Sequence, residues 1–314
     1  MRWALYVSAS DSSPRAGLVV GDAIYGLEAG TTVLDLLGDD GTRLGEAAAT
    51  AVDRPSEVVA LAGAVLRSPF PRPPSIRDSS SFEQHIRAGF KGLNVPWDDN
   101  WYQVPLVYFT NPGDVKGHGE DVTAAPGSEK LDYELECAAV VGQRAVNLTA
   151  AEAEDIIAGY VILNDWSARD IQAAEVGFKV GPYKTKDWAM SAGPFFATKD
   201  ELEPFRSGKS FDLGMRAWVN GEQYSEGNLK DIYWSFGELV AHASRGTVVN
   251  VGDLLGSGTV GTGCILEQSI NFGSDKYPWL VPGDVVTLEI DAIGTLTNRV
   301  IAGPELPDWR LNDG

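Results

Sequence analysis

Short apolar runs separated by polar residues predict a chain built mainly of strands. The runs at residues 3–8 and 18–27 have the length and residue types of strands, whereas those at 33–37 and 56–66 predict short helices. Together these elements predict a small N-terminal α+β domain over residues 1–70.

A proline-rich segment follows, and the pattern after it is mostly β. Four prolines fall within residues 68–74, which predicts an extended connection to a larger domain over residues 75–314. The fold class that the whole pattern predicts is α+β. In the larger domain we predict strands at 102–109, 160–163, 194–198, 212–219, 222–225, 247–251, 264–267, 285–290 and 296–301, helices at 78–90, 149–159 and 229–243, and a long loop at 111–130.

Two acidic stretches adjoin apolar runs in the larger domain. If residues 131–137 form a strand, Asp132, Glu134 and Glu136 share one face, and the residues that follow are wholly apolar. Carboxylates that enter a core must be neutralised, because an unpaired buried charge is strongly destabilising. A divalent cation supplies that charge, and Asp165, at the end of the next apolar run, offers a further oxygen ligand. The alternative is that the acidic side chains form one solvated face of a sheet.

Composition and charge limit the classes of protein to which this chain could belong. A length of 314 residues and a hydrophobic fraction of 44% suit one large domain with a smaller one. A formal charge of −19 argues against binding nucleic acid or an anionic membrane surface, because both would repel the chain. The start lacks a signal-peptide pattern and no apolar run has the length of a membrane span, so a cytoplasmic location is expected. Cys137 and Cys264 lie in apolar runs and are interpreted as buried thiols, with one disulfide as the alternative.

His85 is one of three histidines and lies in a segment with the signature of a helix start. Asp78 or a serine after it is expected to cap that helix. Asp78 and His85 would then lie two turns apart on roughly the same side. Without further context, a lone histidine is more often a surface or core residue than a catalytic one.

Several motifs together resemble one known family. They are LDYELECAAVVG at residues 131–142, GYVILNDWSARDIQ at 159–172, GPYKTKDW at 181–188 and GSGTVGTGCILE at 256–267. Over about residues 75–301 the chain is similar to the fumarylacetoacetate hydrolase family. The resemblance implies a catalytic domain with a mixed β-roll, with which a small N-terminal domain is compatible. It also implies a homodimer.

The resemblance implies a metal site made of carboxylates. The metal ligands that it implies are Asp78, Glu134, Glu136 and Asp165. Carboxylate ligands without a histidine or cysteine cluster select Mg²⁺, with Ca²⁺ and Mn²⁺ as alternatives, over zinc. Four carboxylates leave an excess of negative charge, which Arg169 and Lys186 are candidates to balance. The alternative for these two cations is a surface salt bridge.

The resemblance also implies catalytic and substrate-binding residues. His85 and Glu267 match the pair in which a glutamate fixes the imidazole tautomer, so that the histidine takes a proton from water. Arg169 and Lys186 match positions that contact the substrate or stabilise developing negative charge. The expected substrate-binding residues are Gln172 and Thr259.

The function that these residues imply is a hydrolase that cleaves a C–C bond in a 1,3-diketo acid through an enolate held by the metal. Ser80 and Val176 stand where the namesake enzyme has tyrosines, which predicts a different substrate tail. The alternatives are an oxaloacetate decarboxylase or tautomerase and a dienoate isomerase or hydratase. A metal-stabilised binding module without catalytic activity is a further alternative.

Overall fold

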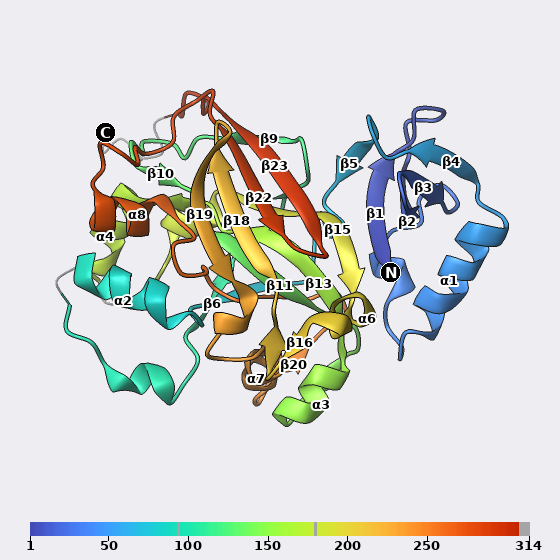
Figure 1. Ribbon diagram of the computed structural model, residues 1–314, viewed down its shortest axis with the longest axis horizontal. Coiled ribbons are helices and arrows are strands. Elements are labelled where there is room, and N and C mark those ends of the chain that lie inside the picture. Colours follow the sequence, from blue (N-terminus) through green and yellow to red (C-terminus); the bar gives the residue numbers. More distant parts are fainter. Residues whose placement is uncertain (93–94, 179–180, 308–314) are drawn as a thin grey trace, which may run out of the picture.

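The computed structural model describes residues 1–92, 95–178 and 181–307 and consists mainly of two sheets (Figure 1). The long sheet contains, in spatial order, β4 (Glu57–Ala60), β3 (Ala23–Gly26), β2 (Pro14–Val20), β1 (Arg2–Val7), β15 (Met190–Thr198), β13 (Ile157–Asn164), β11 (Leu135–Val141), β21 (Leu254–Gly256), β6 (Ile76–Ser79) and β7 (Val107–Thr110), with β5 (Val65–Arg67) beside β1 and β8 (Val115–Lys116) beside β15. The second sheet contains β19 (Glu222–Asn228), β18 (Gly214–Val219), β22 (Val285–Ile290), β23 (Gly294–Ile301) and β9 (Asp121–Thr123).

Short strand pairs and helices complete the described chain. The pairs are β10 (Leu131–Asp132) with β14 (Ser167–Ala168), β12 (Ala145–Val146) with β20 (Val248–Val249), and β16 (Arg206–Ser207) with β17 (Ser210–Phe211). The α-helices are α1 (Thr42–Asp53), α2 (Glu83–Gly92), α3 (Ala150–Asp155), α4 (Arg169–Val176), α5 (Lys184–Asp187), α6 (Lys199–Leu202), α7 (Phe236–Ala243) and α8 (Ile265–Phe272). The 3₁₀ helices are η1 (Leu34–Leu36), η2 (Asp99–Tyr102), η3 (Glu203–Phe205) and η4 (Leu229–Asp231).

Strand β11 lies at the centre of the molecule and packs on both faces. Cys137 and Ala139 belong to the core between the two sheets, together with Leu288 of β22. Val140, which points the other way, packs in a second cluster with Trp3 of β1. Because side chains alternate along a strand, an apolar strand covered on both faces is buried throughout, as all of β11 is.

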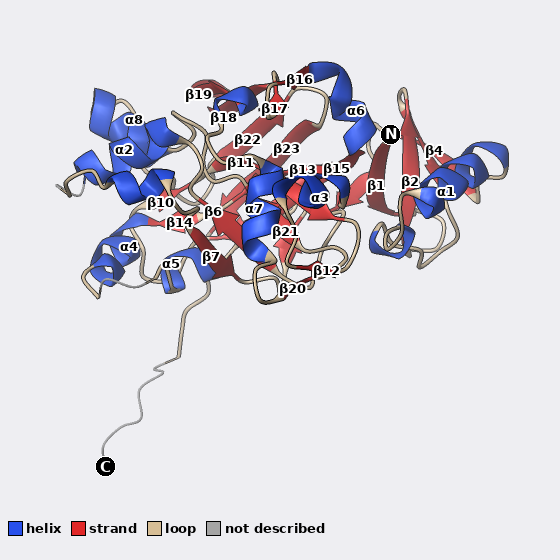
Figure 2. Cartoon of the chain, turned by 90° about the horizontal axis from the view of Figure 1, so that it is seen from below, coloured by secondary structure: helices blue, strands red, loops and turns tan. Residues whose placement is uncertain are grey.

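The N-terminal strands continue the long sheet. Strand β1 pairs antiparallel with β15, with Trp3 opposite Phe196. Figures 1 and 2 both show these strands at one end of the molecule and α2, α4 and α8 at the other end.

Among the described helices, none combines the length and apolarity required to cross a membrane.

The α+β class is confirmed, and several strand predictions are confirmed with it. The predicted hairpin is present as β18 and β19, turned at Asn220 and Gly221 with positive φ angles of 53° and 83°. The strand predicted at 285–290 is β22. Thr149 forms the predicted capping box with Glu152 at the start of α3. Cys137 and Cys264 are both buried free thiols.

In the N-terminal part, the helix predicted at 56–66 is wrong. That segment contains β4, which pairs with β3, and β5, which pairs with β1. The β-branched residues Val58 and Val59 favour the strand once β3 offers hydrogen-bond partners. The helix of this region is α1, which we did not predict, and the element predicted at 33–37 is the 3₁₀ helix η1.

The acidic stretch at 131–137 is not one strand. It divides into β10 and the first part of β11, with Tyr133 and Glu134 between them. The prediction that Asp78 caps a helix is also wrong, because Asp78 lies in β6 and α2 starts only at Glu83. Both differences from the prediction arise because these segments pair with distant strands, and local periodicity carries no information about such pairing.

The strand predicted at 264–267 is wrong, because Cys264 is the N-cap of α8. The apolar residues of the segment 264–267 show helical periodicity only when they are considered together with residues 268–272. The helix predicted at 229–243 begins later, at Phe236, where Ser235 and Glu238 form a capping box. Other boundaries differ: 102–109 contains the last residue of η2 and most of β7, 111–130 contains β8 and β9, the helix predicted at 149–159 ends at Asp155, and β15 starts before 194.

Candidate active site

Four carboxylates from separate elements meet in the interior. They are Asp78 of β6, Glu134 between β10 and β11, Glu136 of β11 and Asp165 after β13, and we call them the acidic quartet. One oxygen of each lies within 4.8 Å of the others, and every member is buried. The pairing of β11 with β13 places Leu135 opposite Asn164, so Glu134 and Asp165 become neighbours.

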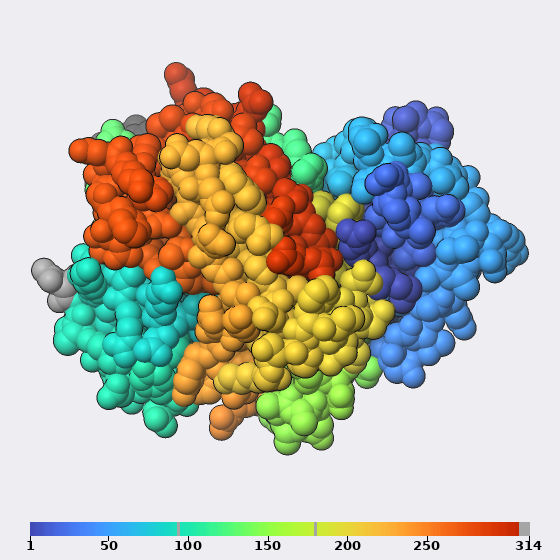
Figure 3. Space-filling view, in the orientation of Figure 1, coloured from blue at the N-terminus to red at the C-terminus, as the bar shows by residue number. Residues whose placement is uncertain are grey.

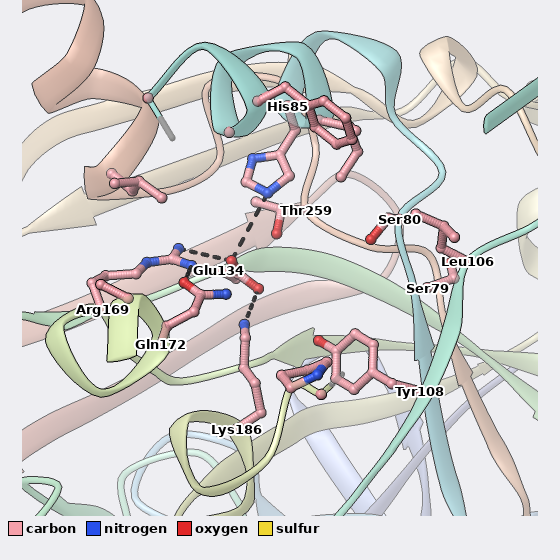
Figure 4. A pocket seen from close by; sticks show the side chains of 18 of the residues that line it. Ser79, Ser80, His85, Leu106, Tyr108, Glu134, Arg169, Gln172, Lys186 and Thr259 are labelled. Carbon is pink, nitrogen blue, oxygen red and sulfur yellow. Dashed lines mark hydrogen bonds and ion pairs between the residues drawn. The ribbon is translucent and has the colours of Figure 1, made fainter. Parts of the chain in front are cut away.

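Two cations compensate part of this charge. Lys186 of α5 places Nζ 2.5 Å from Glu134 Oε2 and 2.8 Å from Asp165 Oδ2. Arg169 of α4 places Nη2 2.7 Å from Glu134 Oε1. Figure 4 shows Arg169 and Lys186 reaching Glu134 from adjacent sides. Both cations are buried, so the alternative of surface salt bridges is wrong.

The pKa values of the quartet differ because its members have different neighbours. Burial raises the pKa of Asp165 to about 8, although Lys186 opposes the shift. Burial and the nearby Asp78 carboxylate raise the pKa of Glu136 well above its ordinary value. Burial acts in the same direction on Glu134, but Lys186 and Arg169 outweigh it and lower its pKa. The quartet therefore retains protons that a bound cation would displace.

The quartet fits a hard divalent cation. Glu136 Oε2 and Asp165 Oδ1 are buried and have no hydrogen-bond partner among the residues that the structure describes. Such buried acceptors are rare in native proteins, and a cation is a natural partner for them. A side chain at Gly256 of β21 would collide with Asp78 Oδ1, so glycine keeps this space open. All-oxygen ligands suit Mg²⁺, Mn²⁺ or Ca²⁺.

Tyr108 of β7 is a site residue that the sequence analysis missed. Its hydroxyl lies 2.7 Å from Asp78 Oδ2 and also contacts Asp165 Oδ2. A hydroxyl has one proton, so it donates to one carboxylate and accepts from the other when that group is protonated. The signal lies in strand pairing, which places Tyr108 opposite Asp78 and is not visible in local sequence.

His85 and Glu267 also meet, although Glu267 was predicted in a strand and lies in helix α8, whereas His85 lies in a helix as predicted. His85 Nδ1 lies 3.4 Å from Glu267 Oε2, and His85 Nε2 lies 3.9 Å from Glu134 Oε1. The backbone N–H of Thr262 donates to Glu267 Oε2 at 2.8 Å, and Gln84 Nε2 donates to Oε1 at 3.2 Å. Glu267 is therefore fixed by donors and points at the imidazole.

Asp132 belongs to this site without being one of the quartet. Its carboxylate accepts from Arg169 Nε at 2.8 Å and from the backbone N–H groups of Ile265 and Leu266 at 2.7 and 2.9 Å. It thus binds the N-terminus of α8, where a negative charge is stabilised by the helix dipole. The same helix carries Glu267, so Asp132 links the acidic stretch to the His85–Glu267 pair.

These groups border one cavity of about 590 Å³. His85, Glu134, Arg169, Gln172, Lys186 and Thr259 all line it (Figure 4). Gln172 Oε1 accepts from Arg169 Nη1 at 3.1 Å, and Thr259 Oγ1 lies 3.3 Å from Glu136 Oε1. The remaining predicted site residues are buried next to lining residues: Asp78, Glu136 and Asp165 cluster with Glu134, and Glu267 contacts His85. Their catalytic and binding roles stay predictions.

Two stacked sheets with a buried carboxylate cluster beside a cavity define a β-roll protein with a candidate metal centre. A family profile described as fumarylacetoacetate (FAA) hydrolase C-terminal matches residues 75–301. The chain belongs to this family.

Curated relatives in the family have different activities. A fumarylacetoacetase of Oryza sativa subsp. japonica is 29% identical over 279 residues, which cover 69% of this chain and 64% of that protein. An oxaloacetate tautomerase of Bacillus subtilis (strain 168) is 30% identical over 239 residues, which cover 75% of this chain and 72% of that protein. The chain thus spans less than two thirds of the rice relative, and membership of the family does not choose between these reactions.

Solved structures confirm the fold. A maleylpyruvate hydrolase from Sphingobium sp. SYK-6, in complex with manganese (II) ion and pyruvate, has a TM-score of 0.72 at 21% identity. The match covers 97% of this chain and 100% of that chain. A fumarylacetoacetate hydrolase from Exiguobacterium antarcticum has a TM-score of 0.69 at 23% identity, covering 96% and 99%. The predicted β-roll fold of this family is therefore confirmed.

Proposed function

We propose that this chain is a divalent-metal-dependent hydrolase that cleaves a C–C bond in a 1,3-diketo acid. The observation that carries the proposal is the placement of the His85–Glu267 pair beside the acidic quartet, at one cavity. Hydrolysis needs a base that takes a proton from the attacking water. The oriented imidazole supplies that base.

The quartet would hold the cation, with Mg²⁺ as the proposed ion and Mn²⁺ or Ca²⁺ as alternatives. The manganese complex of the Sphingobium maleylpyruvate hydrolase supports a divalent ion in this fold. When bound, the cation supplies Lewis-acid stabilisation of negative charge on the substrate oxygens.

The remaining chemistry belongs to side chains. Glu267 accepts a hydrogen bond from His85 Nδ1, so Nε2 is free to take a proton from water. The water oxygen adds to the carbonyl carbon distant from the carboxylate, and Lys186 and Arg169 stabilise the resulting oxyanion. The C–C bond then breaks, its electron pair stays on the methylene carbon, and the imidazolium returns the proton to that carbon. The products are a carboxylic acid and a shorter keto acid.

Gln172 and Thr259 are proposed to orient the substrate. Gln172 is tethered to Arg169, and Thr259 lies beside Glu136, so both present polar groups at the floor of the cavity. The partner is therefore a small-molecule diketo acid.

Product analysis tests the reaction. Purified protein is incubated with acylpyruvates, fumarylacetoacetate-type acids and oxaloacetate, with Mg²⁺ or with a chelator, and the products are identified by mass. Two acids released from a diketo acid only with metal support the hydrolase. Turnover of oxaloacetate alone would overturn it.

His85→Ala tests the base. We expect hydrolysis to fall at least a hundredfold, because general-base catalysis contributes about 10²–10⁴-fold. Metal affinity, measured by calorimetry, should change little because His85 is outside the quartet. Full activity of the variant would contradict the assignment.

The second candidate is an oxaloacetate tautomerase, which the Bacillus subtilis relative favours. It uses the same metal and cations but no attacking water, so it predicts exchange of the enol and keto forms of oxaloacetate, followed by absorbance, without cleavage of any diketo acid. A binding module without turnover is the non-enzymatic alternative, and it predicts metal effects on stability alone.

We also propose a cytoplasmic homodimer and a division into residues 1–70 and 75–314. The family profile starts at residue 75, which supports the division. Light scattering of the purified chain tests the dimer.

A further inference from the structure

The cavity has two unlike sides. In Figure 4, Lys186 and Arg169 lie on one side of Glu134, and His85 on α2 lies on the other. The cavity-lining residues of α2 include Ile86 and Phe90 beside His85. The polar side holds the charges of the proposed reaction, so the other side is where the rest of a substrate would lie.

Helices α2 and α8 form an apolar wall on the His85 side. A side chain at Gly92 of α2 would collide with Ile270 of α8, so the two helices are in close contact. Figure 3 shows their segments, cyan and orange-red, side by side on the surface. The apolar residues of the α2–α8 wall and its margin are Ile86, Phe90, Leu106, Leu266, Ile270 and Trp279.

These apolar side chains are incompletely covered by the protein itself. Leu106 is 48% exposed, and Ile86, Phe90, Leu266 and Ile270 are half-buried. Exposed apolar surface gathered in a concave site is typical of ligand binding rather than of a free surface.

Gly89 adds space to the α2–α8 wall. It lies inside α2 and lines the cavity, yet a Cβ there would meet no atom of the described chain within 4 Å. Glycine inside a helix is about 1 kcal/mol less favourable than alanine. Packing does not require glycine here, and because Gly89 also lines the cavity, the open space beside it is part of that cavity.

The α2–α8 wall offers no partner for a second carboxylate. Its described cavity-lining residues include no lysine or arginine. Arg169 and Lys186 are already paired with buried carboxylates on the opposite side. Lys130 also lines the cavity, but it is exposed to solvent, and an ion pair with an exposed lysine contributes little. Burying an unpaired carboxylate against this wall would be strongly unfavourable.

We propose that the preferred substrate is a 1,3-diketo monocarboxylic acid whose acyl end is a bulky hydrocarbon group, branched or aromatic. This inference rests on the proposed function. The carboxylate and diketone lie at the polar side, and the hydrocarbon tail lies against the α2–α8 wall in the space beside Gly89. The wall thereby excludes diketo acids with a second, distal carboxylate.

A substrate series tests the inference. The enzyme with Mg²⁺ is given 2,4-dioxo acids with acetyl, butanoyl, hexanoyl and benzoyl ends, and a carboxylate-ended acid as long as the hexanoyl member. We expect kcat/KM to rise by about fourfold for each methylene that is buried. The hexanoyl member should exceed its carboxylate-ended counterpart at least tenfold. A preference for the dicarboxylate, or a flat series, would overturn the inference.

Gly89→Leu fills the proposed tail space. It should lower kcat/KM for the hexanoyl and benzoyl acids at least tenfold and leave the acetyl acid within twofold. Gly45→Leu is the matched control, because Gly45 also lies in a helix, α1, with no described atom within 4 Å of a Cβ. Both changes favour the helix, so neither threatens folding. Equal effects of Gly89→Leu on short and long acids would contradict the proposal.

A binding measurement separates this inference from the proposed reaction. Saturated 2-oxo acids of rising chain length are titrated by calorimetry into the protein with Mg²⁺. If no diketo acid is cleaved but affinity rises with chain length and Gly89→Leu removes the rise, the hydrolase fails and the tail site stands. If diketo acids are cleaved without dependence on the tail, the hydrolase stands and the inference fails.

Discussion

At the scale of residues, the carboxylates of the quartet differ in their hydrogen-bond and ion-pair partners. Glu134 is held by Lys186 and Arg169, which keep it ionised. Asp165 and Asp78 share the hydroxyl of Tyr108. Glu136 has one buried oxygen without a described partner. These differences mean that a single substitution can separate a stability role from a metal-binding role.

Tyr108→Phe removes the hydroxyl from between Asp78 and Asp165. We expect the metal-free protein to lose about 1–3 kcal/mol of stability, because buried acceptors lose their donor. With saturating Mg²⁺ the loss should be smaller, since the cation neutralises the same carboxylates. Denaturant unfolding with Mg²⁺ and with a chelator measures both values. An equal loss of stability in the two conditions would contradict this interpretation of Tyr108.

At the scale of elements, the site depends on where two helices begin. Helix α8 starts at Cys264, and Asp132 binds its first N–H groups, so Glu267 faces inward. Helix α4 starts with Arg169, which places its guanidinium against Glu134. The quartet and the His85–Glu267 pair are thus joined through helix N-termini.

Asp132→Asn tests this connection. We expect a loss of about 1–3 kcal/mol, because Arg169 keeps its ion pair with Glu134 but loses the charged acceptor that Asp132 provides. The rate constant kcat should fall as Glu267 shifts. Ser235→Ala is the control: it removes the cap of α7, costs about 1 kcal/mol and should leave kcat unchanged. Chemical denaturation and steady-state kinetics measure both variants, and the interpretation fails if Asp132→Asn affects stability no more than the control does.

The N-termini of the helices differ in whether local sequence could predict them. The capping boxes at Thr149 and Ser235 consist of residues close in sequence, and the first was predicted. The start of α8 depends on Asp132, far away in the chain, and the sequence predicted a strand there. Local interactions were therefore accessible to sequence analysis, whereas a helix fixed by a distant carboxylate was not.

At the scale of the whole molecule, the carboxylates of the quartet come from the long sheet or from residues next to its strands. Strands β6, β11 and β13 belong to the long sheet, and the core packs on both of its faces. The quartet therefore concentrates negative charge inside a chain whose formal charge is already −19. Proton binding and metal binding to the quartet must affect the stability of the entire fold.

Without metal, stability should fall between about pH 4 and pH 8. Burial raises the Asp165 pKa from 3.8 to about 8, so across that interval the folded state binds a proton that the unfolded state releases. Stabilisation from that proton is complete below the unfolded pKa and is lost as pH rises through the folded one. Metal affinity should rise over the same interval, because the cation displaces the proton.

Thermal unfolding at pH 5, 6.5 and 8, with Mg²⁺ and with a chelator, measures this dependence. The stabilisation by Mg²⁺ should be largest at pH 8. In Asp165→Asn the part of the pH dependence that comes from Asp165 should be lost, whereas the part from Glu136, whose pKa is also raised, should remain. Metal-free stability that is constant from pH 5 to pH 8 would contradict the prediction.

The sequence by itself determined the α+β class, the hairpin at Asn220 and Gly221, and the residue types of the proposed metal site. Those features depend on alternation, turn chemistry and charge along short segments, or on motifs that resemble a family. The tertiary structure alone decided that Tyr108 joins Asp78 and Asp165, that Asp132 binds α8 and that Gly89 opens a space beside an apolar wall. Each of these depends on strand pairing or helix packing between distant segments, and local sequence does not record which segments will meet.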